Sequence, residues 1–179
     1  TEGMLVVGEH TTTFENVYDE QGHRTQFCRH ITPPIVPDDL PAAYLDAGGF
    51  YASPIAGEVS PELLAHLKSQ GGVVMLDPQG VLREIEKDGK VEVKSKDLSG
   101  YLKHCDVAKI GMEEAAILKK DVSEAMKELK KSGPSVVIVT RGGDSVLALC
   151  DGKVHEFQTI KVAAQDVTGA GDVFGAAFL

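Results

Sequence analysis

Four consecutive residues near the end of the chain have the types and the order needed to handle a transferred anion: Gly169, Ala170, Gly171 and Asp172. Small residues at the start of a helix leave backbone N–H groups exposed, and these groups, with the positive end of the helix dipole, bind negative charge. Glycine also lets the backbone approach an anion closely. A carboxylate beside such a site suits a general base, which takes a proton from a hydroxyl as that hydroxyl attacks a phosphoryl group.

Two other interpretations of the same residues are open. For an isolated G-A-G-D, a first-turn carboxylate that only complements the helix dipole carries about equal weight, because short motifs match by chance. A dinucleotide-binding loop is the weaker alternative. The spacing of Gly169, Gly171 and Gly175 is one residue longer than G-x-G-x-x-G, and the preceding "AAQD" is not an apolar strand. The sequence also contains no G-x-x-x-x-G-K-[ST] phosphate loop.

The elements that must position these residues alternate between strands and helices from residue 43 onward. Ser60 and Pro61 predict the start of one helix, and Asp121 with Glu124 forms the capping box of another. The apolar stretches "VVMLD", "DVAKI" and "SVVIVT" predict buried strands, and "SVLALC" with "KVHEFQTI" predicts a hairpin. Strands that alternate with helices imply parallel βαβ units with helices on the faces of a sheet.

The first part of the chain has a different character. Residues 4–31 are rich in β-branched and aromatic side chains, with a turn at "DEQG", and the proline-rich "TPPIVPDDLP" follows. This pattern predicts a hairpin or meander and then irregular chain. We therefore expect a β-rich lid or edge segment over residues 1–42 and an α/β core over residues 43–179.

Polar residues and glycines follow the predicted strands. They comprise Asp77 with Gln79 and Gly80, residues 111–114, residues 140–144 and the final stretch. In α/β sheets, ligands bind beyond the carboxyl ends of the strands, so these groups are expected to converge on one edge.

The stretch "DVTGAGDVFGAAFL" resembles the second signature of the PfkB (ribokinase-like) carbohydrate kinases, D-[TV]-x-G-A-G-D followed by a helix of small residues. Upstream, "SVVIVTRGGDSVLAL" resembles the family's nucleotide-binding strand and T-x-G-x-x-G turn. "DVAKIGMEEAAIL" resembles its N-x-x-E segment, and "VVMLDPQGVLR" a D-x-N-x-R-like segment. The stretch "TTTFENVYDEQGHRTQ" is similar to lid strands of archaeal-type members. The resemblance implies a ribokinase-like three-layer α/β/α fold with a mostly parallel sheet and a small β lid, present in part.

The resemblance also implies roles for matching positions. Asp172 would be the catalytic base, and the amides of Gly169, Ala170 and Gly171 would stabilise the transferred phosphoryl group. The other roles are a K⁺ site, a Mg²⁺-organising carboxylate, nucleotide contacts, and contacts to substrate or phosphate. Asp166 and Thr168 would form the K⁺ site, and Glu114 would be the Mg²⁺-organising carboxylate. Arg141 and Gly142 would contact the nucleotide, and Gln79 and Arg83 would contact substrate or phosphate.

The chain departs from the family pattern at several places. Gly111 stands where the family has asparagine, and Ser145 replaces the last glycine of T-x-G-x-x-G. The N-terminal G-G-N segment and the adenine-pocket elements after the signature helix are not found. The resemblance therefore predicts that these 179 residues are part of a longer kinase.

Bulk composition narrows the partners. The net charge of −9 disfavours nucleic acid and anionic membranes, both of which need clustered Lys and Arg. No apolar run approaches the length of a bilayer span. The three cysteines, Cys28, Cys105 and Cys150, are far apart, which indicates reduced thiols in a cytoplasmic protein.

These observations together predict an ATP- and Mg²⁺-dependent kinase, with K⁺ as a further cation. Its acceptor would be a hydroxyl of a small sugar, a polyol such as myo-inositol, or a nucleoside, and a homodimer could form through the lid. The alternative is a non-catalytic kinase-like module that binds a sugar or nucleotide. Asp172 favours the enzyme, whereas the changes at Gly111 and Ser145 favour the alternative.

Overall fold

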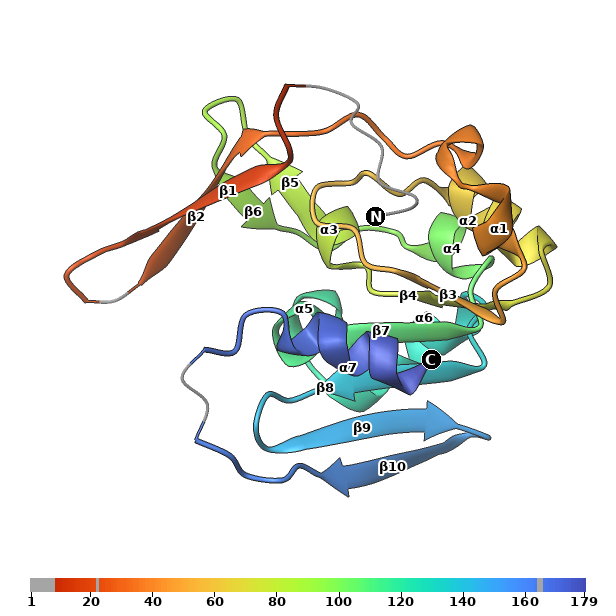
Figure 1. The fold of residues 1–179 in the computed structure, drawn as a ribbon. Coiled ribbons are helices and arrows are strands. Elements are labelled where there is room, and N and C mark those ends of the chain that lie inside the picture. Colours follow the sequence, from red (N-terminus) through yellow and green to blue (C-terminus); the bar gives the residue numbers. More distant parts are fainter. Residues whose placement is uncertain (1–8, 22, 164–165) are drawn as a thin grey trace.

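The centre of the molecule is a six-stranded sheet. The computed structural model describes residues 9–21, 23–163 and 166–179. The strand order is β10-β9-β8-β7-β4-β3, as Figure 1 shows. The four parallel strands are β3 (Gly49–Ala52), β4 (Val73–Leu76), β7 (Val107–Gly111) and β8 (Val136–Thr140). The antiparallel strands β9 (Ser145–Cys150) and β10 (Lys153–Gln158) extend the sheet beside β8. The mostly parallel sheet predicted from the sequence is confirmed.

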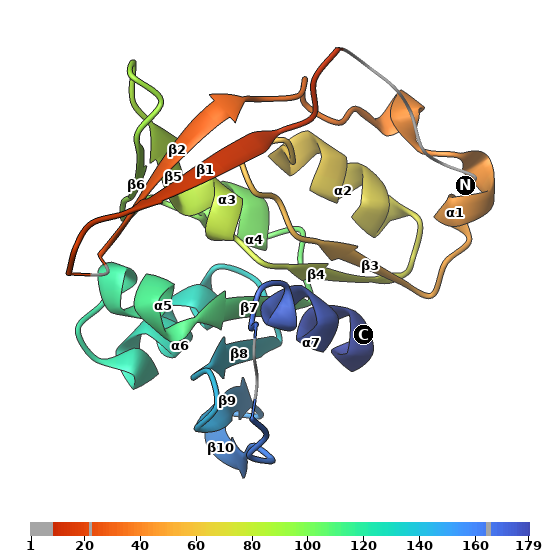
Figure 2. The ribbon, with the colours of Figure 1, turned by 60° about the vertical axis from the view of Figure 1, so that its left-hand side comes forward.

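Helices cover both faces of this sheet. One face carries α2 (Pro61–Ser69), α4 (Ser99–Leu102), α5 (Met112–Leu118) and α6 (Val122–Lys131). The other face carries α7 (Ala170–Phe178), which Figure 2 shows on the opposite side of β7 and β8 from α5 and α6. The three-layer arrangement is therefore confirmed. No helix in the described part of the chain has the length and apolar character to cross a membrane.

Alternation along the strands divides the core in two. Successive side chains of a strand point to opposite faces, so Leu76 and Ala108 join the large cluster under α2 and α6. Their neighbours Met75 and Val107 point to the other face, where Phe174 of α7 packs against them. This parity decides which residues can reach α7 further along the same strands.

The predicted helix starts and the turn of the predicted C-terminal hairpin are confirmed, whereas the predicted "DEQG" turn includes residue 22, which lies outside the described residues. The Ser60 side chain accepts a hydrogen bond from Leu63 N at 3.2 Å, and Asp121 accepts one from Glu124 N at 2.9 Å. Capping of this kind satisfies N–H groups that have no partner within the helix. Asp151 and Gly152 both have positive φ, 48° and 74°, at the turn between β9 and β10.

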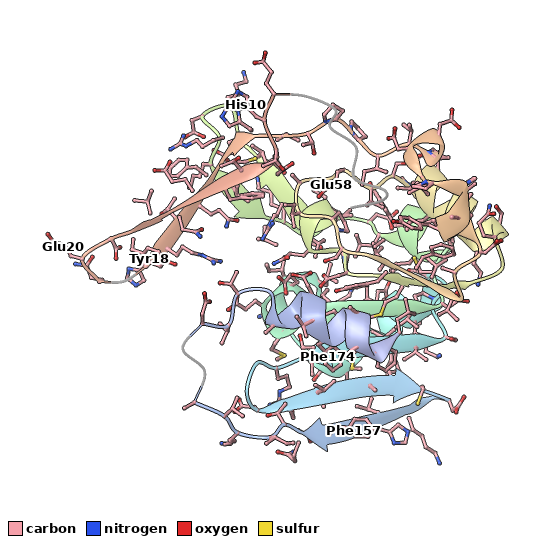
Figure 3. All side chains as sticks on the ribbon, viewed as in Figure 1. His10, Tyr18, Glu20, Glu58, Phe157 and Phe174 are labelled. Carbon is pink, nitrogen blue, oxygen red and sulfur yellow. The ribbon has the colours of Figure 1, made fainter. Side chains whose placement is uncertain are left out.

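A separate β-ribbon projects from the body of the molecule. Strands β1 (Thr13–Tyr18) and β2 (Arg24–His30) pair antiparallel, and Figure 3 shows Tyr18 and Glu20 at their far end. A second small ribbon, β5 (Arg83–Ile85) with β6 (Val91–Val93), joins the first through the hydrogen bond from Cys28 N to Gly89 O at 2.8 Å. Three short helices connect the remaining elements: η1 (Pro37–Asp39), α1 (Ala42–Leu45) and α3 (Gln79–Leu82). The domain boundary after residue 42 and the lid-mediated homodimer stay predictions.

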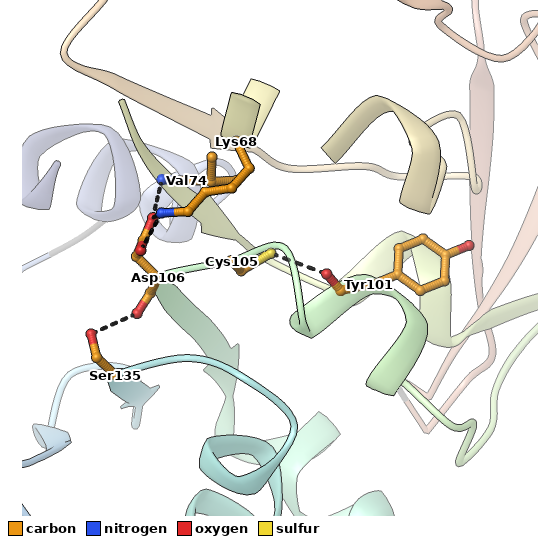
Figure 4. A network of polar contacts seen from close by, with 6 residues as sticks. All are labelled: Lys68, Val74, Tyr101, Cys105, Asp106 and Ser135. Atoms are coloured by element: carbon orange, nitrogen blue, oxygen red, sulfur yellow. Dashed lines mark hydrogen bonds and ion pairs between the residues drawn. The ribbon is translucent and has the colours of Figure 1, made fainter. Parts of the chain in front are cut away.

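A polar network ties together the amino ends of the central strands, as drawn in Figure 4. Asp106 precedes β7 and accepts hydrogen bonds from Lys68 Nζ at 2.5 and 2.7 Å and from Val74 N at 2.9 Å. Ser135, just before β8, donates from its hydroxyl to the Asp106 carbonyl at 3.1 Å. The network links α2 to three strands at the edge opposite the candidate site.

Candidate active site

The site begins at the amino end of α7. Gly169 has φ 76° and ψ 0°, a left-handed conformation that glycine adopts without the strain other residues incur. The amide of Ala170 donates to Val167 O at 3.1 Å, so in this structure it closes the turn into the helix. Asp172 lies in the first turn and is exposed.

A cavity of about 230 Å³ lies in front of this helix end. Five of the residues to which the resemblance assigned roles line it: Gln79, Glu114, Gly169, Gly171 and Asp172. Asp77, Lys109, Gly111 and Val167 complete the lining. The expected convergence on the carboxyl edge of the sheet is therefore present.

Lys109 is the main residue that the sequence interpretation missed. It is 4% exposed and its Nζ forms an ion pair with Asp77 Oδ2 at 2.5 Å, with Asp77 5% exposed. The same ammonium lies against α7, because a Cβ on Gly171 would be 2.7 Å from Nζ. A buried positive charge therefore stands between a carboxylate and the start of the helix, in the wall of the cavity.

Strand register explains why this pair forms. Leu76 of β4 is paired with Ala108 of β7, so the next residues, Asp77 and Lys109, are cross-strand neighbours. Both point to the α7 face by the same alternation that places Met75 and Val107 there. A signal was present in the sequence, since Lys109 is the one charged residue inside the apolar stretch "VAKIG".

The end of β3 contributes a hydroxyl. Ser53 follows this strand, and its Oγ donates to Asp172 Oδ1 at 2.6 Å across 119 residues of sequence. Two residues earlier, Tyr51 lies against α7 at Gly175, where any Cβ would collide with the tyrosine ring. Burial raises the pKa of Tyr51 to about 12, and the nearby charges of Asp77 and Asp172 act in the same direction. The phenol is therefore protonated at neutral pH.

A second cavity, of about 420 Å³, adjoins the first. Gly111 and Glu114 line both cavities, and Arg141 and Gly142 line only the second. The carboxylate of Glu114 folds back onto Gly111, where a side chain would collide with it. The departure from the family asparagine therefore provides the space that the Glu114 carboxylate occupies.

Arg141 is oriented by two partners. Its guanidinium donates to Ser145 Oγ at 3.2 Å and to Glu156 Oε1 at 3.1 Å. Ser145, which stands where the family has glycine, is buried. Gly111 and Ser145, the two positions that depart from the family pattern, thus lie against Glu114 and Arg141, which the resemblance assigns to Mg²⁺ and the nucleotide.

Arg83 and Gln79 have different surroundings. Gln79 lines the smaller cavity, whereas Arg83 donates to Ile55 O at 2.8 Å and lies over the Phe14 ring, 5.0 Å from its centroid. Burial lowers the pKa of Arg83, and the Glu114 charge acts in the opposite direction. Arg83 thus connects the lid strand β1 to the core and lies outside the two cavities.

The residues assigned to K⁺ lie on the loop before α7. Thr168 N donates to Asp166 Oδ1 at 2.8 Å, and this hydrogen bond lowers the pKa of Asp166. The carboxylate is therefore ionised at neutral pH. Neither residue lines the smaller cavity, although Val167 between them does.

The comparison with known proteins gives the family. A family model described as pfkB family carbohydrate kinase matches residues 40–179. The chain belongs to this family.

Relatives of this pfkB family member act on different substrates. A cytidine kinase of Thermococcus kodakarensis is 31% identical over 147 residues, which cover 78% of this chain and 49% of that protein. An inositol 3-kinase of Zea mays is 29% identical over 163 residues, or 89% of this chain and 39% of that protein. The chain thus spans about half the length of the cytidine kinase and less of the inositol kinase.

Solved structures agree on the fold. A pyrophosphate-dependent kinase in the ribokinase family, in its sulfate complex, superposes with a TM-score of 0.81 at 26% identity, covering 96% of this chain and 61% of that one. A ribokinase from Thermotoga maritima gives a TM-score of 0.65 at 22% identity, with 91% and 53% coverage. The ribokinase-like fold predicted from the sequence is confirmed.

Proposed function

We propose that this chain provides the catalytic cavity of a kinase that transfers a phosphoryl group from ATP to a hydroxyl of a small sugar, polyol or nucleoside. The observation that carries the proposal is one cavity that holds an exposed carboxylate, Asp172, beside a helix amino end and a buried ammonium, Lys109. A base, an anion site and a fixed positive charge are the groups that phosphoryl transfer requires.

Asp172 acts as the general base. The acceptor hydroxyl loses its proton to the Asp172 carboxylate as its oxygen forms a bond to phosphorus, and the bond from phosphorus to the leaving donor oxygen breaks. General-base catalysis of this kind contributes about 10²- to 10⁴-fold to the rate. The exposed position of Asp172 allows the proton to leave to water after transfer.

The amino end of α7 and Lys109 stabilise the transferred group. Gly169 and Gly171 present backbone without side chains to the cavity, and Lys109 Nζ lies against Gly171. Positive charge that is already fixed in place needs no rearrangement as negative charge develops on the phosphoryl oxygens. Asp77 holds the ammonium through the buried ion pair.

The remaining predicted groups fit the cations. Mg²⁺ prefers oxygen ligands and keeps several waters, so Glu114 would hold it through water beside the donor phosphates, where it would neutralise their charge. Among the described residues no group of three His, Cys, Asp or Glu is placed to hold a metal. Asp166 and Thr168 offer a carboxylate and a hydroxyl for K⁺.

Pyrophosphate is a second candidate donor. The pyrophosphate-dependent kinase superposes with a TM-score of 0.81, compared with 0.65 for the ribokinase of Thermotoga maritima. Lys109 also provides a positive charge for a phosphate group, and this interaction does not require the donor to carry a base or a ribose. Under ATP, the larger cavity with Arg141 and Gly142 would take the rest of the nucleotide.

The acceptor is a small molecule with several hydroxyls. The relatives named cytidine kinase, fructokinase and inositol 3-kinase support this class without selecting one member. A screen of the intact protein against sugars, polyols and nucleosides, each with ATP and with pyrophosphate, would identify the acceptor and donor. Binding without turnover for every pair would favour the non-catalytic alternative.

The test of the base is Asp172→Asn in the intact protein. We expect kcat to fall by about 10²- to 10⁴-fold, with donor binding retained, because only the proton acceptor is removed. Asp151→Asn, in the exposed turn between β9 and β10, is the matched control and should keep normal turnover. Near-normal kcat in Asp172→Asn would overturn the assignment.

A further inference from the structure

We propose that Ser53 is a positioning residue for the base, holding one oxygen of the Asp172 carboxylate so that the other faces the acceptor hydroxyl. This inference rests on the proposed function, because it needs Asp172 to be the base. It assigns a role to a residue outside the family motifs found in the sequence, at the end of a strand 119 residues away.

The contact itself is short. Ser53 Oγ donates to Asp172 Oδ1 at 2.6 Å, within the range of charge-assisted O–H···O⁻ hydrogen bonds. Such bonds are about twice as strong as neutral ones. Asp172 is exposed, so packing does little to restrict its side chain. Within residues 9–21, 23–163 and 166–179, no second hydrogen bond to this carboxylate accompanies the one from Ser53.

The backbone around Ser53 is held on both sides. Asp77 N donates to Ala52 O at 2.9 Å, and Gly80 N donates to Pro54 O at 2.9 Å. Pro54 is fully buried, and a Cβ on Gly80 would collide with the Pro54 carbonyl. These contacts place the hydroxyl before it meets the carboxylate. The loop after β3 therefore holds the Ser53 hydroxyl in a fixed position, so that Ser53 orients the Asp172 carboxylate and does not adjust to it.

The first turn of α7 is held from the same sheet edge. Tyr51 of β3 contacts Gly175 one turn further along the helix, and Lys109 of β7 contacts Gly171. Tyr51 and Lys109 thus fix the position of the helix backbone near Asp172, while the hydrogen bond from Ser53 fixes the rotamer of the Asp172 carboxylate. A base whose proton-accepting oxygen is held in line gains rate chiefly through orientation.

The experiment compares Ser53→Val with Ser53→Thr in the intact protein, because the two side chains have nearly the same shape and differ by the hydroxyl. We expect Ser53→Val to lower kcat by about 10- to 100-fold, the loss expected for a hydrogen bond to a charged group. KM for donor and acceptor should stay within about twofold, since neither contact set changes. Ser53→Thr should retain wild-type kcat within about threefold.

A matched control and a double variant complete the test. Ser69→Ala removes a hydroxyl that donates to His66 O on the exposed end of α2, and it should leave kcat unchanged. In an Asp172→Asn background, Ser53→Val should have no further effect, because the carboxylate that it orients is gone. Thermal melting of each variant checks the fold.

The outcomes separate the two ideas. If Asp172→Asn is slow but the Val and Thr variants turn over alike, the Ser53 inference fails and the proposed base stands. If Asp172→Asn keeps its turnover, the proposed function loses its base and the Ser53 inference falls with it. If both Ser53→Val and Ser53→Thr are slow to the same extent, the hydroxyl is not the cause, and the positioning role is wrong.

Discussion

Two lysine–aspartate pairs lie at opposite ends of β4 and β7 and have the same 2.5 Å separation. At the carboxyl end, Lys109 and Asp77 have side chains that are only 6% and 7% exposed, and both line the cavity. At the amino end, Lys68 and Asp106 are 44% and 33% exposed, and Asp106 also accepts a hydrogen bond from Val74 N (Figure 4). The N–O distances of the two ion pairs are equal, so the pairs differ in burial and not in separation.

Burial changes what each pair can do. Taking two charges out of water costs several kcal/mol per ion, and a buried pair recovers this only when both partners stay in place. A half-exposed pair costs and contributes little. The Lys109 pair is therefore poorly suited to add stability alone, but it is well suited to keep a charge fixed where the proposed function places an anion. The Lys68 pair helps to hold the backbone of β4, since Asp106 also accepts a hydrogen bond from Val74 N.

The largest difference between the pairs should appear on removal of the lysine charge. Lys109→Met is expected to lower kcat by about 10²- to 10³-fold, as for loss of one donor to a developing negative charge. The free energy of unfolding should fall by about 3–5 kcal/mol, because Asp77 is left buried and unpaired. Steady-state kinetics and denaturant unfolding of the intact protein measure both. Lys68→Met is the matched control with normal kcat; full activity in Lys109→Met would exclude Lys109 from stabilising the transferred phosphoryl group.

A double substitution separates stability from chemistry at the buried pair. Asp77→Asn combined with Lys109→Met removes both charges. The Asn side chain keeps an oxygen that can accept from the backbone N of Gln79, which in the wild-type structure donates to Asp77 Oδ1 at 3.2 Å. The double variant should recover about 2 kcal/mol of the unfolding free energy lost in Lys109→Met, because no unpaired charge remains. Its kcat should stay low. Recovery of kcat together with stability would show that Lys109→Met acted by unfolding.

Much of the fold was predictable because its signals are local. Ser60, Asp121 and the Asp151–Gly152 turn each act within four residues, and the two helices and the hairpin that they predict are confirmed. The small residues before Asp172 likewise predicted the start of α7. Parallel pairing followed from the alternation of strands and helices.

The candidate site was predictable only in part, because its remaining contacts depend on register and on distant segments. Lys109 gains its role from pairing with Asp77 across 32 residues, and Ser53 from a helix 119 residues away. Strand β3 has four residues, too few for a clear pattern. The resemblance assigned Arg83 to substrate or phosphate contact. Arg83 follows the last residue of α3, begins β5 and lies over Phe14 of β1, outside both cavities, so that assignment stays a prediction.

Asp106 should affect stability without affecting turnover. Asp106→Ala leaves the amide of buried Val74 without its acceptor, which is expected to cost about 1–3 kcal/mol of unfolding free energy. Asp106→Asn keeps an acceptor oxygen and should cost less. kcat should remain normal in both variants, because the network lies at the far edge of the sheet. A fall in kcat at full folding would show that the two ends of the sheet are coupled.

The pH dependence of Asp106 gives a smaller effect of known sign. Burial opposes ionisation of Asp106, but hydrogen bonds from Lys68 and Val74 N outweigh it and leave the pKa below that of a free aspartate. A lowered folded-state pKa stabilises the fold above the unfolded value of about 3.9, and this stability is lost as pH falls through the folded pKa. The wild-type advantage over Asp106→Asn should thus be constant from about pH 7 to 5 and shrink toward pH 3. An advantage that grows on acidification would contradict this sign.

The smallest effect belongs to the lysine of the exposed pair. Lys68→Met keeps the aliphatic stem but removes a charge that is 44% exposed, and exposed pairs contribute about 0.2–1 kcal/mol. Asp106 retains Val74 N as a donor and water as a partner, so its carboxylate is not left unpaired as Asp77 is in Lys109→Met. Salt sharpens the contrast, because the screening length falls from about 10 Å at 0.1 M to about 3 Å at 1 M. In urea unfolding, the difference between wild type and Lys68→Met should shrink at 1 M NaCl, whereas the loss in Lys109→Met should persist. Equal salt sensitivity of the two losses would mean that burial does not distinguish the pairs.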